Sequence, residues 1–182
     1  MARGLVLLVA ALHTAGMAHA EGAFSVSSTT FGNGGSVATA QVFNAEGCEG
    51  GNRSPQLSWR NAPEGTRSFA ITMFDPDAPG RGWWHWAVAN LPARVKALPE
   101  NASGSGALAK LGAVEARNDF NTGGYGGPCP PPGKPHRYVI TVYAIGTDKI
   151  AGLEQGRPAE MFDHEIDGAA LGRAQLTVSY GR

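Results

Sequence analysis

The sequence lacks the short motifs that mark several common classes of enzyme. It contains no GxSxG nucleophile elbow, no GxGxxG or Walker phosphate loop, and no HxH or HExxH metal spacing. A zinc site built from Asp75, His85 and His136 is therefore not supported by any ligand spacing. These absences argue against a serine hydrolase with a nucleophile elbow, a nucleotide-binding fold and a zinc enzyme.

An excess of charge of one sign and long hydrophobic runs are also missing. Lys and Arg number 15 and Asp and Glu also number 15, so the composition predicts no basic face for nucleic acid. The apolar run at residues 5–12 is much shorter than the roughly 20 residues of a membrane span. Arg3 before this run and Ala18-His19-Ala20 after it predict a secretory signal peptide at residues 1–20. Residues 21–182 would then form a single exported domain, in the periplasm or outside the cell.

Cysteine is limited to Cys48 and Cys129. In an exported protein, an even pair of cysteines usually forms a disulfide. This bond would close a loop of about 80 residues and stabilise the fold by about 4 kcal/mol through chain entropy. A metal pair and a reactive thiol are the alternatives, but neither cysteine has a CxxC partner, which favours the disulfide.

Glycine and proline, in contrast, are abundant. The 26 glycines and 12 prolines indicate a loop-rich, mostly β domain. Period-two alternation predicts the strands. They are expected at residues 24–31, 37–43, 56–60, 136–145 and 174–180, with two more inside residues 68–92. We expect an exposed loop at residues 93–115, an ordered Pro/Gly loop at residues 121–135, and a helix at residues 158–171 with Gly172 as its C′ residue.

A proline-rich turn separates the two strands inside residues 68–92. Pro76 and Pro79 end the first strand, because proline has no N–H to donate to a β-ladder. The turn therefore holds Asp75 and Asp77 at the end of one strand, while His85 lies at the start of the next. Acidic, imidazole and indole groups gathered at strand ends suggest a site.

His136 and Tyr138 begin another predicted strand and complete this polar group. Imidazole N–H and tyrosine O–H groups can donate to phosphate oxygens, and a carboxylate can accept from an ammonium or hydroxyl group of the same ligand. Indole and proline faces would form apolar walls. Structural roles remain open: Asp75 can cap its turn, His85 can bond a carbonyl in the core, and the neighbouring tryptophans can fill the core.

Several motifs, in this order, resemble the phosphatidylethanolamine-binding proteins, and in particular their bacterial Raf kinase inhibitor-like branch. They are Asn52-Arg53-Ser54-Pro55-Gln56-Leu57-Ser58-Trp59, Asp75-Pro76-Asp77-Ala78-Pro79, Trp84-His85-Trp86, Gly127-Pro128-Cys129-Pro130-Pro131 and His136-Arg137-Tyr138. These blocks span roughly residues 48–145. A cysteine before the Pro-Pro pair fits an exported, disulfide-bonded subgroup.

The resemblance implies a mostly β fold, an antiparallel β-sandwich with a large central sheet, a smaller sheet and one or two short helices. It also implies a pocket for phosphate-bearing or similar anions. The ligand-binding residues would be Asp75, His85, Pro130, Pro131, His136 and Tyr138. Supporting residues would be Asp77, Trp84, Trp86 and Tyr125, with Asp77 acting more as scaffold than as ligand contact.

Residues and resemblance together predict a non-enzymatic binding protein for a phosphorylated or anionic small ligand, such as a phospholipid head group. The alternative is an exported inhibitor or signalling partner of a protease or kinase. A hydrolase with Asp75 and His85 as an acid–base pair is a third hypothesis, but the sequence offers it no activated nucleophile. We expect no cofactor, no metal, no nucleic-acid partner and no membrane span.

Overall fold

The structure is a computed structural model that describes Met1 and residues 22–182. Apart from Met1, the predicted signal peptide at residues 1–20 lies outside the described residues. Within the described part of the chain, no helix has the length and apolar character needed to cross a membrane.

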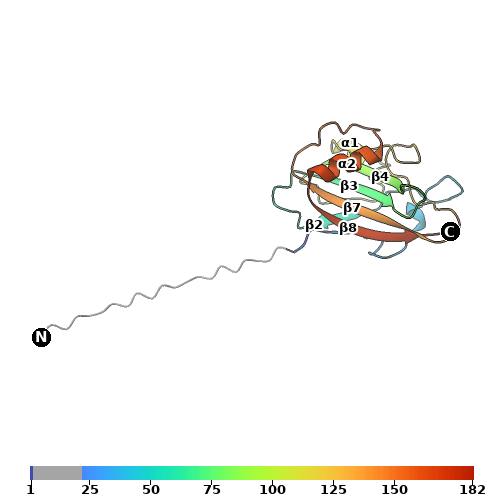
Figure 1. Ribbon diagram of the computed structural model, residues 1–182, viewed down its shortest axis with the longest axis horizontal. Helices are drawn as coiled ribbons and strands as arrows, with labels where there is room; N and C mark the ends of the chain where they lie inside the picture. The colour runs from blue at the N-terminus through green and yellow to red at the C-terminus, as the bar shows by residue number, and fades with distance from the viewer. Residues whose placement is uncertain (2–21) are drawn as a thin grey trace.

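Two antiparallel sheets carry the fold (Figure 1). The large sheet has the strand order β6-β4-β3-β7-β8, and the small sheet has the order β1-β2-β5. The strands of the large sheet are β3 (Ser68–Asp75), β4 (Trp83–Pro92), β6 (Val114–Glu115), β7 (His136–Ile145) and β8 (Ala170–Tyr180). Those of the small sheet are β1 (Ser25–Ser27), β2 (Leu57–Arg60) and β5 (Ala97–Leu98). The predicted mostly β fold with a large and a smaller sheet is confirmed.

Two α-helices, α1 (Ala107–Lys110) and α2 (Ala159–Ala169), accompany the sheets. α2 lies across one face of the large sheet, over β4 and β7 (Figure 1). The predicted helix is confirmed, but its predicted end is wrong. The backbone is already extended at Ala170, so the chain passes from α2 into β8 and Gly172 lies within the strand.

Alternation along β3 divides its side chains between two cores. Phe69 and Ile71 are buried between the two sheets, where Trp59 of β2 meets the ring of Phe69 edge-on. On the other face, Ala70 is buried in a second core that also contains Phe162 of α2. A side chain as small as alanine on this face leaves room for the helix to pack close to the sheet. The period-two reading of this strand therefore holds.

The strand predicted at residues 37–43 is wrong. A short 3₁₀ helix, Thr39–Gln41, lies there instead, and the neighbouring backbone bonds to the loop at residues 50–53. Val42 and Phe43 are nevertheless buried in the core between the sheets. Their apolar pattern thus results from burial and not from strand pairing. In a run this short, the pattern does not distinguish a strand from another buried segment.

The exposed loop predicted at residues 93–115 is also wrong. This segment contains β5, α1 and β6, and it buries Leu98, Ala102 and Leu108 in the core. These elements are only two to four residues long. Elements this short are too brief to display a period of 2 or 3.6 residues.

The antiparallel order of the large sheet brings three strand ends together. Because β3 pairs with β4 and β7 in opposite directions, its last residue, Asp75, lies opposite Trp83 at the start of β4. The neighbouring Phe74 lies opposite Val139 near the start of β7. The end of β3 and the starts of β4 and β7 therefore lie at the same end of the large sheet, which we call the pocket end.

Candidate ligand-binding pocket

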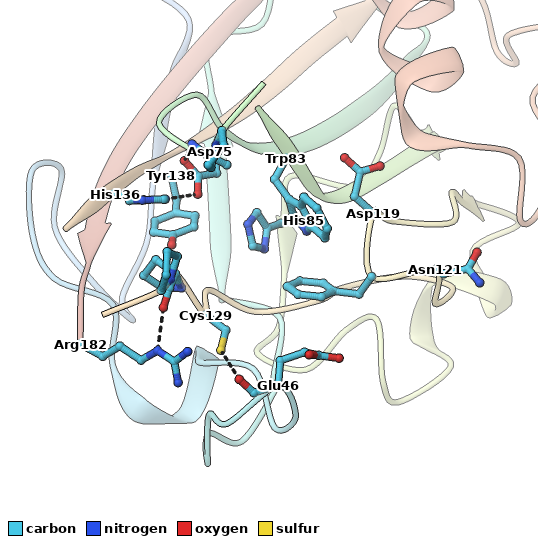
Figure 2. Close-up of a pocket in the computed structure, with 15 residues that line it drawn as sticks. Glu46, Asp75, Trp83, His85, Asp119, Asn121, Cys129, His136, Tyr138 and Arg182 are labelled. Carbon is cyan, nitrogen blue, oxygen red and sulfur yellow. Dashed lines mark hydrogen bonds and ion pairs between the residues drawn. The ribbon is translucent and has the colours of Figure 1, made fainter. Parts of the chain in front are cut away.

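A cavity of about 610 Å³ opens at the pocket end (Figure 2). This volume suits a small organic ligand. All six residues predicted to bind a ligand line it: Asp75, His85, Pro130, Pro131, His136 and Tyr138. The structure thus brings together side chains that lie up to 63 residues apart in the chain, from residue 75 to residue 138.

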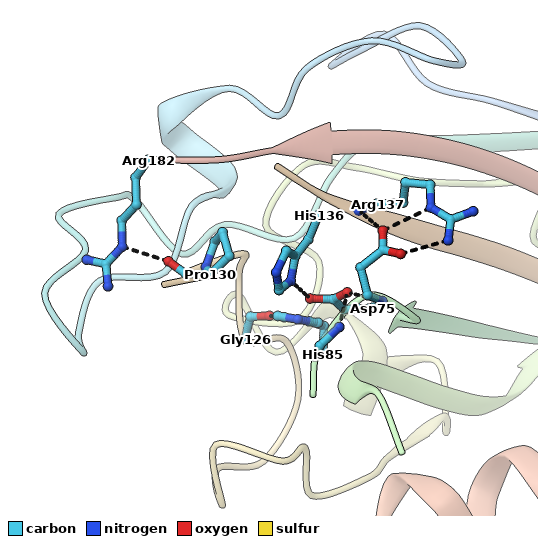
Figure 3. Close-up of polar contacts among 9 residues, drawn as sticks. Asp75, His85, Gly126, Pro130, His136, Arg137 and Arg182 are labelled. Carbon is cyan, nitrogen blue, oxygen red and sulfur yellow. Dashed lines mark hydrogen bonds and ion pairs between the residues drawn. The ribbon is translucent and has the colours of Figure 1, made fainter. Parts of the chain in front are cut away.

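The Asp75 carboxylate is buried and bonded on both oxygens. Oδ1 accepts the backbone N–H groups of Asp77 at 2.8 Å and Ala78 at 3.0 Å, which fixes the turn after β3. Oδ2 lies 2.7 Å from Nδ1 of His136 (Figure 3). Since a carboxylate only accepts, Nδ1 carries the proton and the other ring nitrogen of His136 is left for further contacts. Asp75 therefore orients His136 and the turn.

Asp77 lies outside the cavity lining and binds Arg137. Its Oδ2 accepts the backbone N–H of Arg137 at 2.8 Å and Nε at 2.9 Å, and its Oδ1 accepts Nη2 at 2.7 Å. These hydrogen bonds from Arg137 hold the pKa of the Asp77 carboxyl well below its usual range. The two carboxylates of one turn thus differ: Asp75 bonds to a lining histidine, and Asp77 ties the turn to β7.

A β-bulge places His85 in the cavity wall. Met73 pairs with Trp86, and the next residue, Phe74, pairs with Trp84, so His85 has no partner in this ladder. An extra residue of this kind disrupts the ladder locally and redirects a side chain. His85 lines the cavity although it occupies an interior position of β4.

Trp84 and Trp86, predicted to support the pocket, do not line it. Trp84 lies on the α2 face of the sheet, where its ring centroid is 4.4 Å from that of Phe74. Trp86 is fully buried in the core, and its Nε1–H donates to Glu115 at 2.9 Å. The indole in the cavity lining belongs to Trp83. Both of the predicted tryptophans thus pack the fold around the site.

Gly126 fixes the position of His85. Its N–H donates to the backbone carbonyl of His85 at 2.9 Å, and its own carbonyl accepts the ring Nδ1–H at 2.7 Å (Figure 3). A Cβ at position 126 would lie 2.6 Å from the ring of Phe120, so only glycine fits this approach. Burial in this wall lowers the pKa of His85 to about 4, which makes the ring neutral near pH 7.

Two buried donors in the lining have no partner in the described residues. They are the hydroxyl group of Tyr138 and the indole Nε1–H of Trp83. The Tyr138 ring meets the His85 ring edge-on, with centroids 5.1 Å apart. Burial raises the pKa of the Tyr138 hydroxyl far above its usual value, so it remains protonated and able to donate.

The loops that close the cavity are joined by covalent and polar links. The predicted disulfide between Cys48 and Cys129 is present and lies directly before Pro130. Arg182 links the same two loops, because its Nε donates to the Pro130 carbonyl at 2.7 Å (Figure 3). Its Nη1 donates to the Gly47 carbonyl at 2.9 Å. The part of the cavity wall formed by Pro130, which we call the Pro130 wall, is therefore held by the disulfide and by Arg182.

Comparison with known proteins identifies the family. The family model described as phosphatidylethanolamine-binding protein matches residues 27–181. The chain belongs to the phosphatidylethanolamine-binding protein family. This result confirms the resemblance predicted from the motifs and supports a binding protein of this family's type.

Members of the family with similar sequences come from Escherichia coli strain K12. The UPF0098 protein YbcL is 45% identical over 161 residues, which cover 87% of this chain and 87% of YbcL. The UPF0098 protein YbhB is 43% identical over 141 residues, covering 76% of this chain and 88% of YbhB.

Solved structures of family members also match. The crystal structure of E. coli YbcL, described as a new member of the mammalian PEBP family, has a TM-score of 0.82 at 44% identity, covering 87% of this chain and 98% of that one. A putative phosphatidylethanolamine-binding protein homologue, CT736 from Chlamydia trachomatis, has a TM-score of 0.73 at 29% identity, covering 88% of this chain and 98% of that one.

Several lining residues were missed by the sequence analysis, among them Trp83, Asp119, Phe120 and Arg182. Two of them carried a usable signal, because Asp119 and Phe120 directly precede the Pro/Gly loop that holds the family's Pro-Pro pair. Trp83 directly precedes the family's Trp-His-Trp block, but the face of the sheet on which its side chain lies depends on the bulge, which the sequence does not reveal. Arg182 is distant from every motif.

Tyr125, predicted to support the pocket, lies behind it. Its hydroxyl donates to the Gln41 carbonyl at 2.9 Å, and its backbone N–H donates to Oγ of Ser103 at 3.0 Å. Its ring packs edge-on against Trp86. Tyr125 therefore anchors the Pro/Gly loop, and this loop is ordered, as expected, since residues 124–128 are buried.

Asp75 and His85, the acid–base pair of the hydrolase hypothesis, are not hydrogen-bonded to each other in this structure. The Asp75 carboxylate bonds to His136, while the ring of His85 bonds to the backbone of Gly126. Among the described residues, no three His, Cys, Asp or Glu side chains are grouped to hold a metal ion.

Proposed function

We propose that this protein binds a small phosphorylated or otherwise anionic ligand in the cavity at the pocket end, without turning it over. The observation that carries this proposal is the pair of buried, unpartnered donors in the lining, on Tyr138 and Trp83. Leaving such a group unpaired costs about 1–3 kcal/mol, and a ligand oxygen that accepts from it offsets this cost. Donors without acceptors favour a ligand rich in acceptor oxygens, such as a phosphate.

The other lining groups support the same assignment. His136, oriented by Asp75, adds an imidazole, and Arg182 adds a guanidinium whose Nε and Nη1 already bond to loop carbonyls. Pro130 and Phe120 supply apolar walls for the rest of the ligand. An anionic group with an organic substituent, such as a phospholipid head group, fits this combination.

The composition of the lining supports binding without catalysis. Within the described residues, the lining contains no serine or threonine, and its cysteine, Cys129, is held in the disulfide. Covalent catalysis by serine, threonine or cysteine needs such a side chain activated by an adjacent base, and the lining offers no free side chain of these three types. The alternative role, inhibition of a protease or kinase, stays a prediction from the resemblance alone.

We also propose that the protein acts outside the cytosol, in the periplasm or beyond it. The disulfide between Cys48 and Cys129 supports this location, because such bonds persist in oxidising compartments. Cell fractionation tests it: the protein is expected in the periplasmic fraction or the medium, and accumulation in the cytosol would contradict the proposal.

Titration followed by NMR tests the binding function. Inorganic phosphate and O-phosphoethanolamine are added separately to the wild type, to Tyr138→Phe and to Tyr143→Phe. The second variant is a matched control, because Tyr143 lies on the α2 face and donates to Asp163. We expect shifts at the cavity lining in the wild type and the control and weaker binding in Tyr138→Phe. Absence of shifts with both ligands would disprove the function.

A further inference from the structure

The two nitrogens of the His85 ring have different surroundings. Nδ1 lies 2.7 Å from the carbonyl oxygen of Gly126, and because a carbonyl only accepts, Nδ1 carries a proton whether the ring is neutral or charged. Within residues 22–182, Nε2 has no hydrogen-bond partner. The ring lines the cavity between Tyr138 and Trp83 (Figure 2). In the neutral ring, Nε2 is therefore an acceptor available to a ligand.

The groups around His85 do not charge the ring near pH 7. The backbone of Gly126, the carboxylate of Asp75, the backbone of Gly127 and the carboxylate of Asp119 all favour a proton on it, but both carboxylates already accept hydrogen bonds from other groups. Tyr138 packs against the ring as a neutral phenol, and His136 directs its Nδ1 toward Asp75. Burial of His85, which is 2% exposed, outweighs the attraction of the two carboxylates.

We propose that Nε2 of His85 accepts a hydrogen bond from the ligand, so that the pocket selects oxyanions that carry their own proton. Inorganic phosphate and protonated phosphomonoesters belong to this class. The inference rests on the proposed function and narrows it, because anion binding alone requires no acceptor in the site.

The physical basis is the difference between Nε2 of His85, which accepts a hydrogen bond, and the neighbouring groups of Tyr138 and Trp83, which donate one. Phosphate and sulfate are tetrahedral oxyanions of similar size, and the donors on Tyr138 and Trp83 serve the oxygens of both. Near pH 7 phosphate keeps a P–OH group that can donate to Nε2, whereas sulfate carries no proton. A sulfate oxygen would bring its lone pairs against the lone pair of Nε2, leaving this buried acceptor unpaired.

Calorimetry on the whole protein tests this selectivity. At neutral pH, inorganic phosphate is expected to bind about 10-fold or more tightly than sulfate, the ratio typical of one hydrogen bond to a charged group. Dimethyl phosphate, which represents the diester of an intact phospholipid, has no P–OH and is expected to bind as weakly as sulfate. Diester binding as tight as phosphate binding would overturn the inference and point to an intact lipid as the source of the ligand.

The pH dependence of sulfate binding provides a second arm. As the pH falls toward about 4, His85 takes up a proton at Nε2 and the acceptor becomes a donor. Sulfate affinity is then expected to rise. A His85→Gln variant is expected to lose both this rise and the preference for phosphate, because a glutamine side chain offers a donor or an acceptor after rotation of its amide.

Nitrogen-15 NMR of the imidazole rings keeps the inference testable if His85→Gln does not fold. The spectrum of the wild type at neutral pH is expected to show His85 as a neutral ring with the proton on Nδ1. A proton on Nε2 in the free protein, or equal affinity for phosphate and sulfate, would overturn this inference and leave the proposed function intact. Binding of neither anion would disprove the proposed function and this inference together.

Discussion

The two ends of the large sheet treat buried polar groups differently. At the end opposite the pocket, the Ser68 hydroxyl donates to a loop carbonyl at 2.6 Å, and the Asn90 side chain accepts the N–H of Ile150 at 2.9 Å. At the pocket end, the donors of Tyr138 and Trp83 are just as buried but unpartnered. The Ser68 and Asn90 side chains are therefore satisfied by the chain itself, whereas the donors of Tyr138 and Trp83 remain available to another molecule.

Loss of the disulfide, which restrains the pocket end alone, is expected to have the largest effect on stability, because this bond closes a long loop. A variant with both Cys48→Ser and Cys129→Ser frees a loop spanning 81 residues, and the free energy of unfolding should fall by about 4 kcal/mol. Urea denaturation measures this change. Phosphate titration of the folded variant should also show weaker binding, and unchanged binding would mean that the Pro130 wall holds without the bond.

Acid is expected to destabilise the pocket end by a slightly smaller amount. The pKa of His85 is about 4 in the folded protein and about 6.5 in the unfolded chain, so between these values only the unfolded state takes up the proton. The His85 contribution to stability is complete above about pH 6.5 and is lost as the pH falls to about 4, a change of about 3 kcal/mol.

Denaturation curves across this pH range measure the effect of His85. Carboxylates elsewhere also titrate in this window, so the readout is the difference between the wild type and His85→Gln. The stability of the variant should depend less steeply on pH. Parallel curves for the two proteins would show that His85 does not remain neutral in the fold.

At the opposite end, Asn90→Ala should reduce stability and leave binding unchanged. The substitution orphans the buried N–H of Ile150 and places alanine at a backbone φ of 64°. These two costs predict a loss of about 2 kcal/mol in the free energy of unfolding, measured by urea denaturation. Phosphate affinity is expected to equal that of the wild type. Weakened binding would contradict the difference proposed between the two ends of the sheet.

Tyr138→Phe should change stability least and should give the clearest test of the difference between the two ends of the sheet. The hydroxyl has no partner within the described residues, so its removal leaves no protein group unpaired, and we expect a change below about 1 kcal/mol in the free energy of unfolding. Phosphate affinity, in contrast, should fall about 10-fold. A large loss of stability would mean that the hydroxyl serves the fold after all.

The long elements and most lining residues could be predicted from the sequence. β3 and β7 are uninterrupted strands of eight and ten residues with most of their residues buried, and α2 shows a helical stripe over eleven residues. Asp75, His85 and His136 belong to motifs of the family, so the resemblance was enough to predict them as site residues.

The remaining features depend on contacts that a local pattern does not record. Alternation in β4 does not indicate the bulge, so the prediction names Trp84 and Trp86 as supporting residues and does not include Trp83. The hydrogen bond that joins Arg182 to Gly47 spans 135 residues, and no motif marks either of its partners. β5, α1 and β6 are too short for any periodic signal.

The bulge at His85 also has an evolutionary consequence. The ladder between β3 and β4 proceeds from the Phe74–Trp84 pair directly to the Met73–Trp86 pair. Loss of the single codon for His85 would give a continuous ladder, with both tryptophans still on their present faces and no imidazole acceptor at this point of the cavity wall. A one-codon deletion can therefore separate the inherited fold from the inherited site, and an alignment gap at this position would mark descendants that keep the sheet but no longer distinguish one oxyanion from another.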